Sequence, residues 1–224
     1  MKNKIKIYFL ENSYNYNGDD LDKDGIGGAE KILINITNAL SRDENLIIKV
    51  FNNTDKPKII NKVHWNNINQ IDENDKPDYL ISMSDANLFN KLSSNNNFLW
   101  SHSVQNIEKF IRKKQLIPFL KHKPIMILEG DYHYRNRSFF TSFYGKKILK
   151  IAVDEDFLNF KINFNHIPEP RAIFTTKSDR NLDFLLKSWH KIKKNSPKAK
   201  LFINPPFELT EINKKDDVLL RKKG

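Results

Sequence analysis

The sequence predicts an α/β protein: a parallel β-sheet with helices on both faces, followed by part of a second unit of the same kind. Three observations lead to this prediction. Short runs such as 46–53 and 78–84 are mostly apolar, as strands are when both faces of a sheet are covered. Helix-like stretches alternate with these runs, which is typical of parallel-sheet proteins. Two prolines within 165–171 then separate a second strand–helix–strand pattern from the first.

The first part of the chain holds most of the expected elements. Residues 4–10 form the first strand, and the polar, acidic, turn-rich stretch 11–24 forms a loop. Ligands of such sheets bind outside the carboxyl ends of the strands. The remaining strands are expected at 46–53, 62–68, 78–84, 97–103, within 124–134 and at 145–153, and further helices at 86–93 and 105–116.

The first helix follows a cluster of three glycines, Gly25, Gly27 and Gly28, in a chain that has only 7. Glycines gather where the backbone turns with positive φ or approaches another group closely. A helix start with glycine amides can hold a phosphate or a sugar hydroxyl, and a simple helix-entry turn is the alternative. Glu30 takes the third glycine position of the dinucleotide fingerprint, so no nicotinamide cofactor is expected. The buried face is expected to hold Ala29, Ile32, Leu33, Ile36, Ala39 and Leu40.

The second part of the chain contains a strand at 172–176, a helix at 178–194 and a strand at 198–203. The sequence therefore predicts two domains, 1–164 and 165–224. One strand–helix–strand unit buries too little surface to be stable alone, so it either packs on the first domain or belongs to a truncated one, and truncation is favoured. Ser178 or Asp179 is expected to cap the helix, whose apolar face holds Leu182, Leu185, Leu186 and Trp189.

Composition narrows the class of protein. The chain has 224 residues and a formal net charge of +11, which favours an anionic partner; a lysine-rich compositional background is the alternative, because the lysines are scattered. No cysteine is present, so disulfides and thiolate metal sites are excluded. No run approaches the length of a membrane span, and the start of the chain lacks the apolar core of a signal peptide. We therefore expect a cytoplasmic protein.

Three segments resemble one enzyme family. GIGGAEKILINITNAL (25–40) resembles the start of group 1 glycosyltransferases (glycosyltransferase family 4), and NFLWSHS (97–103) resembles the strand that ends in that family's active-site histidine. RAIFTTKSDRNLDFLLKSWHKIKKNSPKAKLFI (171–203) resembles the opening of the family's second domain. The resemblance implies a GT-B fold of two Rossmann-like domains, an acceptor-side domain and a nucleotide-sugar-binding domain. It also implies transfer of a sugar to a hydroxyl acceptor in surface-polysaccharide or lipid-linked glycan synthesis.

The resemblance assigns roles to particular residues. His102 would face the donor sugar or its diphosphate, and Arg180, with Lys177 as a looser match, would bind the diphosphate. Gly25, Gly27, Gly28 and Glu30 would form the loop beside the transferred sugar. Asn181 stands where the family has glycine, and the family's later pair of glutamates eight positions apart is absent. This chain is therefore expected to be an incomplete, metal-independent transferase, with activity on its own in question.

Two alternatives stay open. The D-x-D triplet Asp154–Asp156 could hold a divalent cation, although this signal is weak in a chain with 27 acidic residues, and the histidines lack zinc-site spacing. The basic, aromatic stretches 110–116 and 134–137 could instead mark a non-enzymatic module that binds nucleic acid or an anionic membrane. Of these two partners nucleic acid is the less expected. In the resembled family, a basic face of the first domain can lie on the inner membrane surface.

Overall fold

The computed structural model divides the chain into two compact units, and each is described by itself. Unit 1 comprises Met1–Asp22 and Gly27–Ala152, and unit 2 comprises Lys23–Ile26 and Val153–Gly224. The predicted domain boundary at residue 164 lies outside the described residues. The structure describes residues 4–23, 26–152, 159, 161, 169–175 and 180–203.

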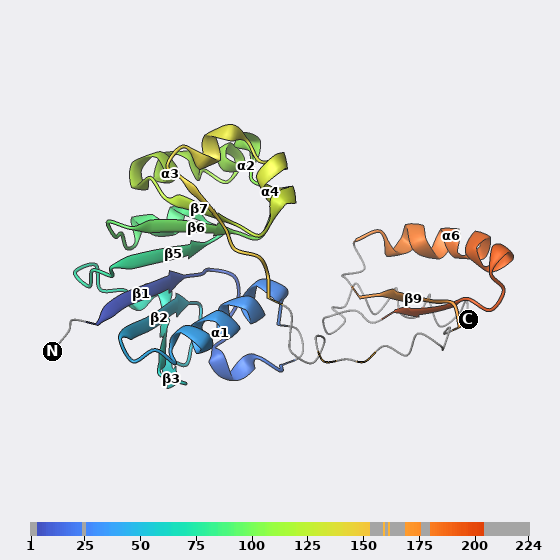
Figure 1. Cartoon of the computed structure of the whole chain (residues 1–224), viewed down its shortest axis with the longest axis horizontal. Helices are drawn as coiled ribbons and strands as arrows, with labels where there is room; N and C mark the ends of the chain where they lie inside the picture. The colour runs from blue at the N-terminus through green and yellow to red at the C-terminus, as the bar shows by residue number, and fades with distance from the viewer. Residues whose placement is uncertain are drawn as a thin grey trace. The chain divides into compact units, whose positions relative to one another are not determined.

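Unit 1 is built on an eight-stranded sheet with the order β3-β4-β2-β1-β5-β6-β7-β8 (Figure 1). Within it only β3 runs antiparallel to its neighbour, β4. The predicted α/β fold with a mostly parallel, Rossmann-like sheet is therefore confirmed. The strands are β1 (Ile5–Leu10), β2 (Leu46–Asn52), β3 (Lys58–Ile60), β4 (Val63–Asn67), β5 (Tyr79–Met83), β6 (Asn97–Ser101), β7 (Ile125–Leu128) and β8 (Lys146–Ile148).

Helices connect most of the parallel strands, because a parallel pair needs a crossover rather than a tight turn. The crossover from β2 to β4 contains β3 instead. The longest helix in unit 1 is α1 (Gly28–Leu40), between β1 and β2. The other connecting helices are short: the 3₁₀ helices η1 (Gly18–Asp20), η2 (Ile68–Gln70), η3 (Ala86–Asn90) and η4 (Phe139–Ser142), and the α-helices α2 (Ile107–Arg112), α3 (Leu116–His122) and α4 (Asp131–Asn136).

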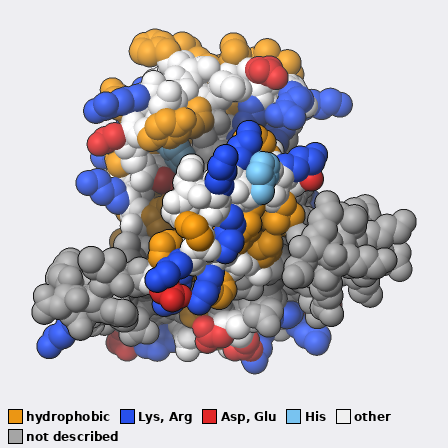
Figure 2. All heavy atoms as spheres, turned by 90° about the vertical axis from the view of Figure 1, so that its right-hand side faces the viewer, with side chains coloured by type: hydrophobic (Ala, Val, Ile, Leu, Met, Phe, Trp, Pro, Cys, Tyr) orange, Lys and Arg blue, Asp and Glu red, His pale blue; other side chains and the backbone are white. Residues whose placement is uncertain are grey.

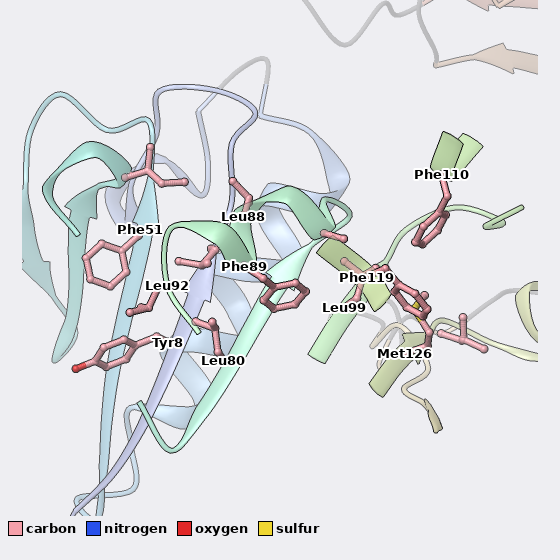
Figure 3. Close-up of a cluster of buried hydrophobic side chains, with 14 residues drawn as sticks. Tyr8, Phe51, Leu80, Leu88, Phe89, Leu92, Leu99, Phe110, Phe119 and Met126 are labelled. Carbon is pink, nitrogen blue, oxygen red and sulfur yellow. The ribbon is translucent and has the colours of Figure 1, made fainter. Parts of the chain in front are cut away.

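A buried hydrophobic cluster joins one face of the sheet to η3, α2 and α3 (Figure 3). The strands contribute alternate residues such as Tyr8 and Leu10 of β1, as expected when side chains alternate between faces. Phe110 of α2 and Phe119 of α3 meet edge to face at 5.2 Å between ring centroids. No residue of α1, which the structure describes throughout, belongs to this cluster, so α1 covers the other face.

The buried face of α1 differs in part from the predicted one. Leu33 is fully buried as expected, but Ala39 is exposed, and Glu30, Ile34 and Thr37 are buried instead. The hydroxyl of Thr37 donates to the backbone carbonyl of Leu33 at 2.8 Å. A polar residue can therefore lie on the inner face of this helix, because the backbone of the same helix provides its partner.

Three further elements differ in detail from what the sequence predicted. The helix expected at 105–116 is two helices, α2 and α3, separated at Lys114, whose φ of 54° lies in the left-handed region. The helix expected at 86–93 is the short η3. The strand β3 was not predicted, because three residues at the edge of a sheet leave too short an apolar run to detect.

Unit 2 has the predicted strand–helix–strand order: β9 (Arg171–Phe174), α6 (Leu182–Asn195) and β10 (Lys200–Ile203). The two strands pair in parallel. Leu182 is buried, and the three other residues of the predicted apolar face are half-buried. Ser178 and Asp179, the expected caps, lie outside the described residues. In both units, no helix that the structure describes is long and apolar enough to cross a membrane.

Candidate functional site at the carboxyl edge of the sheet

Four neighbouring strands of unit 1 are each followed directly by a polar residue. Glu11 follows β1, Ser84 follows β5, His102 follows β6 and Glu129 follows β7. Because these strands run parallel, all four residues lie at one edge of the sheet. The strand order also reverses here, since the chain builds outward from β1 to β2 on one side and from β5 to β7 on the other. Ligands of open α/β sheets bind at such a reversal.

The central feature of this edge is a contact between His102 and Glu129. The Nδ1 atom of His102 is hydrogen-bonded to Oε1 of Glu129, and the two side chains are only 16% and 10% exposed. The imidazole also lies against the indole of Trp100, with 5.4 Å between ring centroids. The other ring nitrogen, Nε2, is shielded from solvent and has no hydrogen-bond partner among the residues described. A buried polar atom without a partner is unusual in a folded protein.

Ser84 supports the backbone beside His102. Its φ of 58° lies in the left-handed region, which is uncommon for a residue other than glycine, and such residues concentrate at functional sites. The Ser84 amide donates to the carbonyl of Trp100 at 2.8 Å. The His102 amide donates to Ser84 Oγ at 3.4 Å. The end of β6 is therefore fixed to the residue that follows β5.

A second group of polar residues joins the end of β1 to the start of α1. Glu11 and Glu30 are both buried, and the hydroxyl of Ser13 donates to Glu30 Oε1 at 2.8 Å. Burial raises the pKa of Glu11, and the charge of Glu30 adds to this effect. Carboxylates near a helix start interact favourably with its dipole. Because two carboxyl groups already lie beside this helix start, it suits a neutral hydroxyl better than a phosphate.

The predicted glycines behave differently from one another. Gly27 precedes α1 with a φ of −75°, so positive φ is not the reason for glycine there. A Cβ atom on Gly27 would lie 2.3 Å from Glu30 Oε2, which shows that the carboxylate approaches this backbone closely. A Cβ atom on Gly28 would meet nothing within 4 Å. Gly25 lies outside the described residues.

The predicted residues of unit 2 are only partly described. Arg180 is exposed in the turn that leads into α6, and Lys177 lies outside the described residues. Asn181, which replaces the glycine of the resembled family, has a φ of 66°. Asparagine tolerates this left-handed region better than most residues, so the replacement keeps the backbone conformation that glycine would adopt.

Glu129, Glu11 and Ser84 were not predicted as site residues. Glu129 and Ser84 contact residues that are distant in sequence, so no local motif marks them. One signal could have identified them: in the structure each comes immediately after a strand, although the predicted strand 78–84 included Ser84 itself and the strand predicted within 124–134 had no stated end. A polar residue at that position lies at the ligand-binding edge of a parallel sheet.

Neither a search for metal-binding side chains nor comparison with known proteins assigns a function to this edge of the sheet. The part of the chain that the structure describes contains no group of three or more His, Asp or Glu side chains arranged to hold a metal ion. Asp154 and Asp156 lie outside that part.

No protein-family model matches the sequence, and no curated protein matches it. The likeness to group 1 glycosyltransferases therefore depends on the three quoted segments.

Proposed function

We propose that this chain carries the acceptor-side domain and donor-binding residues of a nucleotide-sugar-dependent glycosyltransferase. The observation that carries the proposal is the His102–Glu129 pair at the carboxyl edge of the sheet, with Nε2 of His102 unpartnered among the described residues. The histidine stands where the resembled family has its active-site histidine. A buried imidazole held by a carboxylate at a ligand-binding edge is a common arrangement for a reacting hydroxyl group.

Each unit has its own role in this proposal. In unit 1, His102 and the residues around Gly28 contact a sugar or acceptor hydroxyl. In unit 2, Arg180 pairs with the diphosphate of the donor, and Lys177 adds a second positive charge. Departure of the nucleotide builds negative charge on phosphate oxygens, and a well-placed donor stabilises such a transition state by about 3–4 kcal/mol. Neither role uses a metal ion.

A melting-temperature screen tests the proposal directly. The full chain is heated with a panel of nucleotide sugars and with the free nucleotides, and at least one nucleotide sugar is expected to raise the midpoint by a few degrees at saturation. Arg180→Ala is expected to abolish the rise, whereas Arg112→Ala, which removes the same charge from an exposed site in unit 1, leaves it unchanged. The absence of any response across the panel would contradict the proposal.

A second candidate function is supported by the surface of residues 105–151. This segment carries eleven Lys and Arg against three Asp and Glu, whereas residues 1–104 carry twelve basic and fourteen acidic residues. Basic residues are scattered along the chain, but the excess of positive over negative charge between residues 1 and 151 comes from this segment. Large apolar side chains are exposed in the same segment, including Ile117 at 78% and Phe139 at 79%. In Figure 2 hydrophobic, Lys and Arg side chains gather at the top of the view, the end at which Figure 1 places α2 and α3.

Exposed apolar side chains among cations fit an anionic membrane better than a nucleic acid, because lipid can bury them. The expected result is salt-sensitive binding to vesicles that contain phosphatidylserine and no binding to phosphatidylcholine vesicles. Ile117→Ser combined with Phe139→Ser should weaken this binding. Lys31→Ser and Lys58→Ser, two exposed sites in the first 104 residues, serve as the control. Tighter binding to random DNA than to vesicles would favour a nucleic-acid module instead.

A further inference from the structure

We infer that Glu129 is a positioning residue, which keeps the proton of neutral His102 on Nδ1 so that Nε2 accepts a hydrogen bond from a substrate hydroxyl. The identity of that hydroxyl rests on the proposed function. The position of the proton on the His102 ring does not depend on the proposed function, because it is inferred from contacts within unit 1.

The protonation state follows from donor and acceptor chemistry. An ionised carboxylate can only accept hydrogen bonds, so the nitrogen that contacts Glu129 must carry a proton. In a neutral imidazole the second nitrogen then has a lone pair and no proton. When the His102 ring is neutral, Glu129 therefore leaves Nε2 as an acceptor. Without such a partner, a histidine ring is free to exchange between its two neutral forms.

The fold positions both partners of the His102–Glu129 contact. Ser101 pairs with Leu128 in the register of β6 and β7, so the next residue of each strand, His102 and Glu129, faces the same edge. The His102 amide reaches Ser84 Oγ, and the imidazole lies against Trp100. Each partner is mostly buried, which restricts rotation of both side chains. The ring is therefore oriented by its surroundings before any ligand binds.

The free acceptor selects the chemistry of the ligand. A phosphate oxygen is itself an acceptor at neutral pH and cannot donate to Nε2, whereas a hydroxyl can. The two buried carboxyl groups near α1, Glu11 and Glu30, add further acceptor oxygens to the same edge of the sheet. Unit 1 is thus suited to a polyol. His102 is assigned to a hydroxyl of the sugar or of the acceptor, rather than to the diphosphate.

Nitrogen NMR of the full chain labelled with ¹⁵N-histidine tests the inference without any ligand. Spectra are recorded at increasing pH until the nitrogen shifts of the histidines report neutral rings. His102→Asn identifies the signals of His102 among the 6 histidines. The wild type is expected to show a protonated Nδ1 and an unprotonated Nε2. In Glu129→Gln the amide can donate to Nδ1, so the proton should move to Nε2 in a large fraction of molecules.

Glu108→Gln is the matched control, because it removes the same charge from an exposed position on α2. It should leave the His102 signals unchanged, and melting curves confirm that each variant is folded. A wild type with its proton on Nε2, or a Glu129→Gln variant with the wild-type pattern, would overturn the inference.

Kinetics separate this inference from the proposed function. With the nucleotide sugar that gives the largest melting shift, Glu129→Gln should lower kcat at least about tenfold and leave the donor KM within about twofold. An equal loss in kcat and in donor binding would contradict a positioning role. If no nucleotide sugar raises the melting midpoint, the proposed function fails, and the NMR result still decides whether Glu129 sets the proton on His102.

Discussion

The phenol of Tyr8 donates a 2.6 Å hydrogen bond to the carboxylate of Asp75, which connects β1 to the segment before β5. Lys6 and Lys49 donate to the same carboxylate at 3.0 and 2.6 Å. Burial raises the pKa of Tyr8, and the hydrogen bond to Asp75 raises it further, so the phenol stays neutral. Because Asp75 precedes β5, it lies toward the amino end of the strand that Ser84 follows. Its network therefore supports the fold rather than the candidate site.

Asp75→Asn is expected to reduce stability at neutral pH. Burial alone would raise the pKa of Asp75, but hydrogen bonds from Lys49, Tyr8 and Lys6 outweigh it and lower the pKa from 3.8 to about 2. A carboxyl group whose pKa falls on folding stabilises the protein above its unfolded pKa, and this contribution disappears as the pH falls through the folded pKa. The shift corresponds to about 2 kcal/mol at pH 7.

Urea unfolding checks this prediction. The gap in unfolding free energy between wild type and Asp75→Asn should be about 1–2 kcal/mol near neutral pH and should narrow as the pH falls from about 4 toward about 2. Glu73→Gln, an exposed change of the same charge two residues away, should have little effect. A gap that does not depend on pH would show that packing, not charge, is responsible.

Phe119→Ala is expected to be one of the most destabilising changes in unit 1. The Phe119 ring packs against Phe110, Phe140 and Tyr144, with centroids 5.2, 5.9 and 5.5 Å away. Truncation of such a buried ring costs about 3–5 kcal/mol, because it leaves a cavity. Phe139→Ala, at an exposed neighbour of this cluster, should change stability by less than about 0.5 kcal/mol. Equal losses in urea unfolding would contradict the packing described for α2, α3 and η4.

The contact between Phe110 and Phe119 shows why the strands of this region were predicted from the sequence better than its helices. Residues 46–53, 78–84 and 97–103 were predicted as strands from short, mostly apolar runs, and β2, β5 and β6 lie within them. In a single straight helix, Phe110 and Phe119 would be about 13–14 Å apart along the axis. Both rings instead pack in one cluster, which requires the chain to reverse near Lys114. Tertiary packing sets this break, and a local apolar pattern does not contain it.

The candidate site was predictable only where a local motif existed. His102 was singled out because an apolar strand precedes it and because its segment resembles a known family. Glu129 has no such motif, and it approaches His102 only because the register of β6 and β7 places Ser101 opposite Leu128, 27 residues away. Strand order and register are properties of the folded sheet. For this reason the histidine could be identified from the sequence and its carboxylate partner could not.

Gly28→Ala tests whether a ligand approaches the start of α1. The added methyl group meets nothing within 4 Å, and alanine favours the helix, so stability should stay equal or rise by up to about 1 kcal/mol. The melting shift produced by a nucleotide sugar should nevertheless shrink, because the methyl group occupies the space proposed for the ligand. If the nucleotide sugar raises the melting temperature of this variant as much as that of the wild type, Gly28 serves only the turn into α1.

Gly27→Ala is the companion change, and it should lower stability, whereas Gly28→Ala should not. Its methyl group would lie 2.3 Å from Glu30 Oε2, so the Glu30 side chain must move and its hydrogen bond from Ser13 is lost. The expected cost is about 1 kcal/mol of stability, measured by urea unfolding. A neutral effect would mean that Glu30 has an equally good alternative position.

Ser84→Gly is expected to separate stability from function. Ser84 has a φ of 58°, a conformation that costs most residues about 1–2 kcal/mol and glycine little. Lys123, at the end of α3, has a φ of 49° and is the matched position away from the site. Glycine at either position should raise stability by less than about 1 kcal/mol, because greater freedom of the unfolded chain offsets part of the gain.

Only Ser84→Gly should also alter the site, since Ser84 Oγ accepts the hydrogen bond from the His102 amide. The expected result is a changed His102 nitrogen spectrum and a smaller nucleotide-sugar melting shift in Ser84→Gly, with both unchanged in Lys123→Gly. If the two variants respond alike, the left-handed conformation of Ser84 serves only the turn after β5. If they differ, the strain at Ser84 is retained because its side chain holds the backbone of the histidine that the site requires.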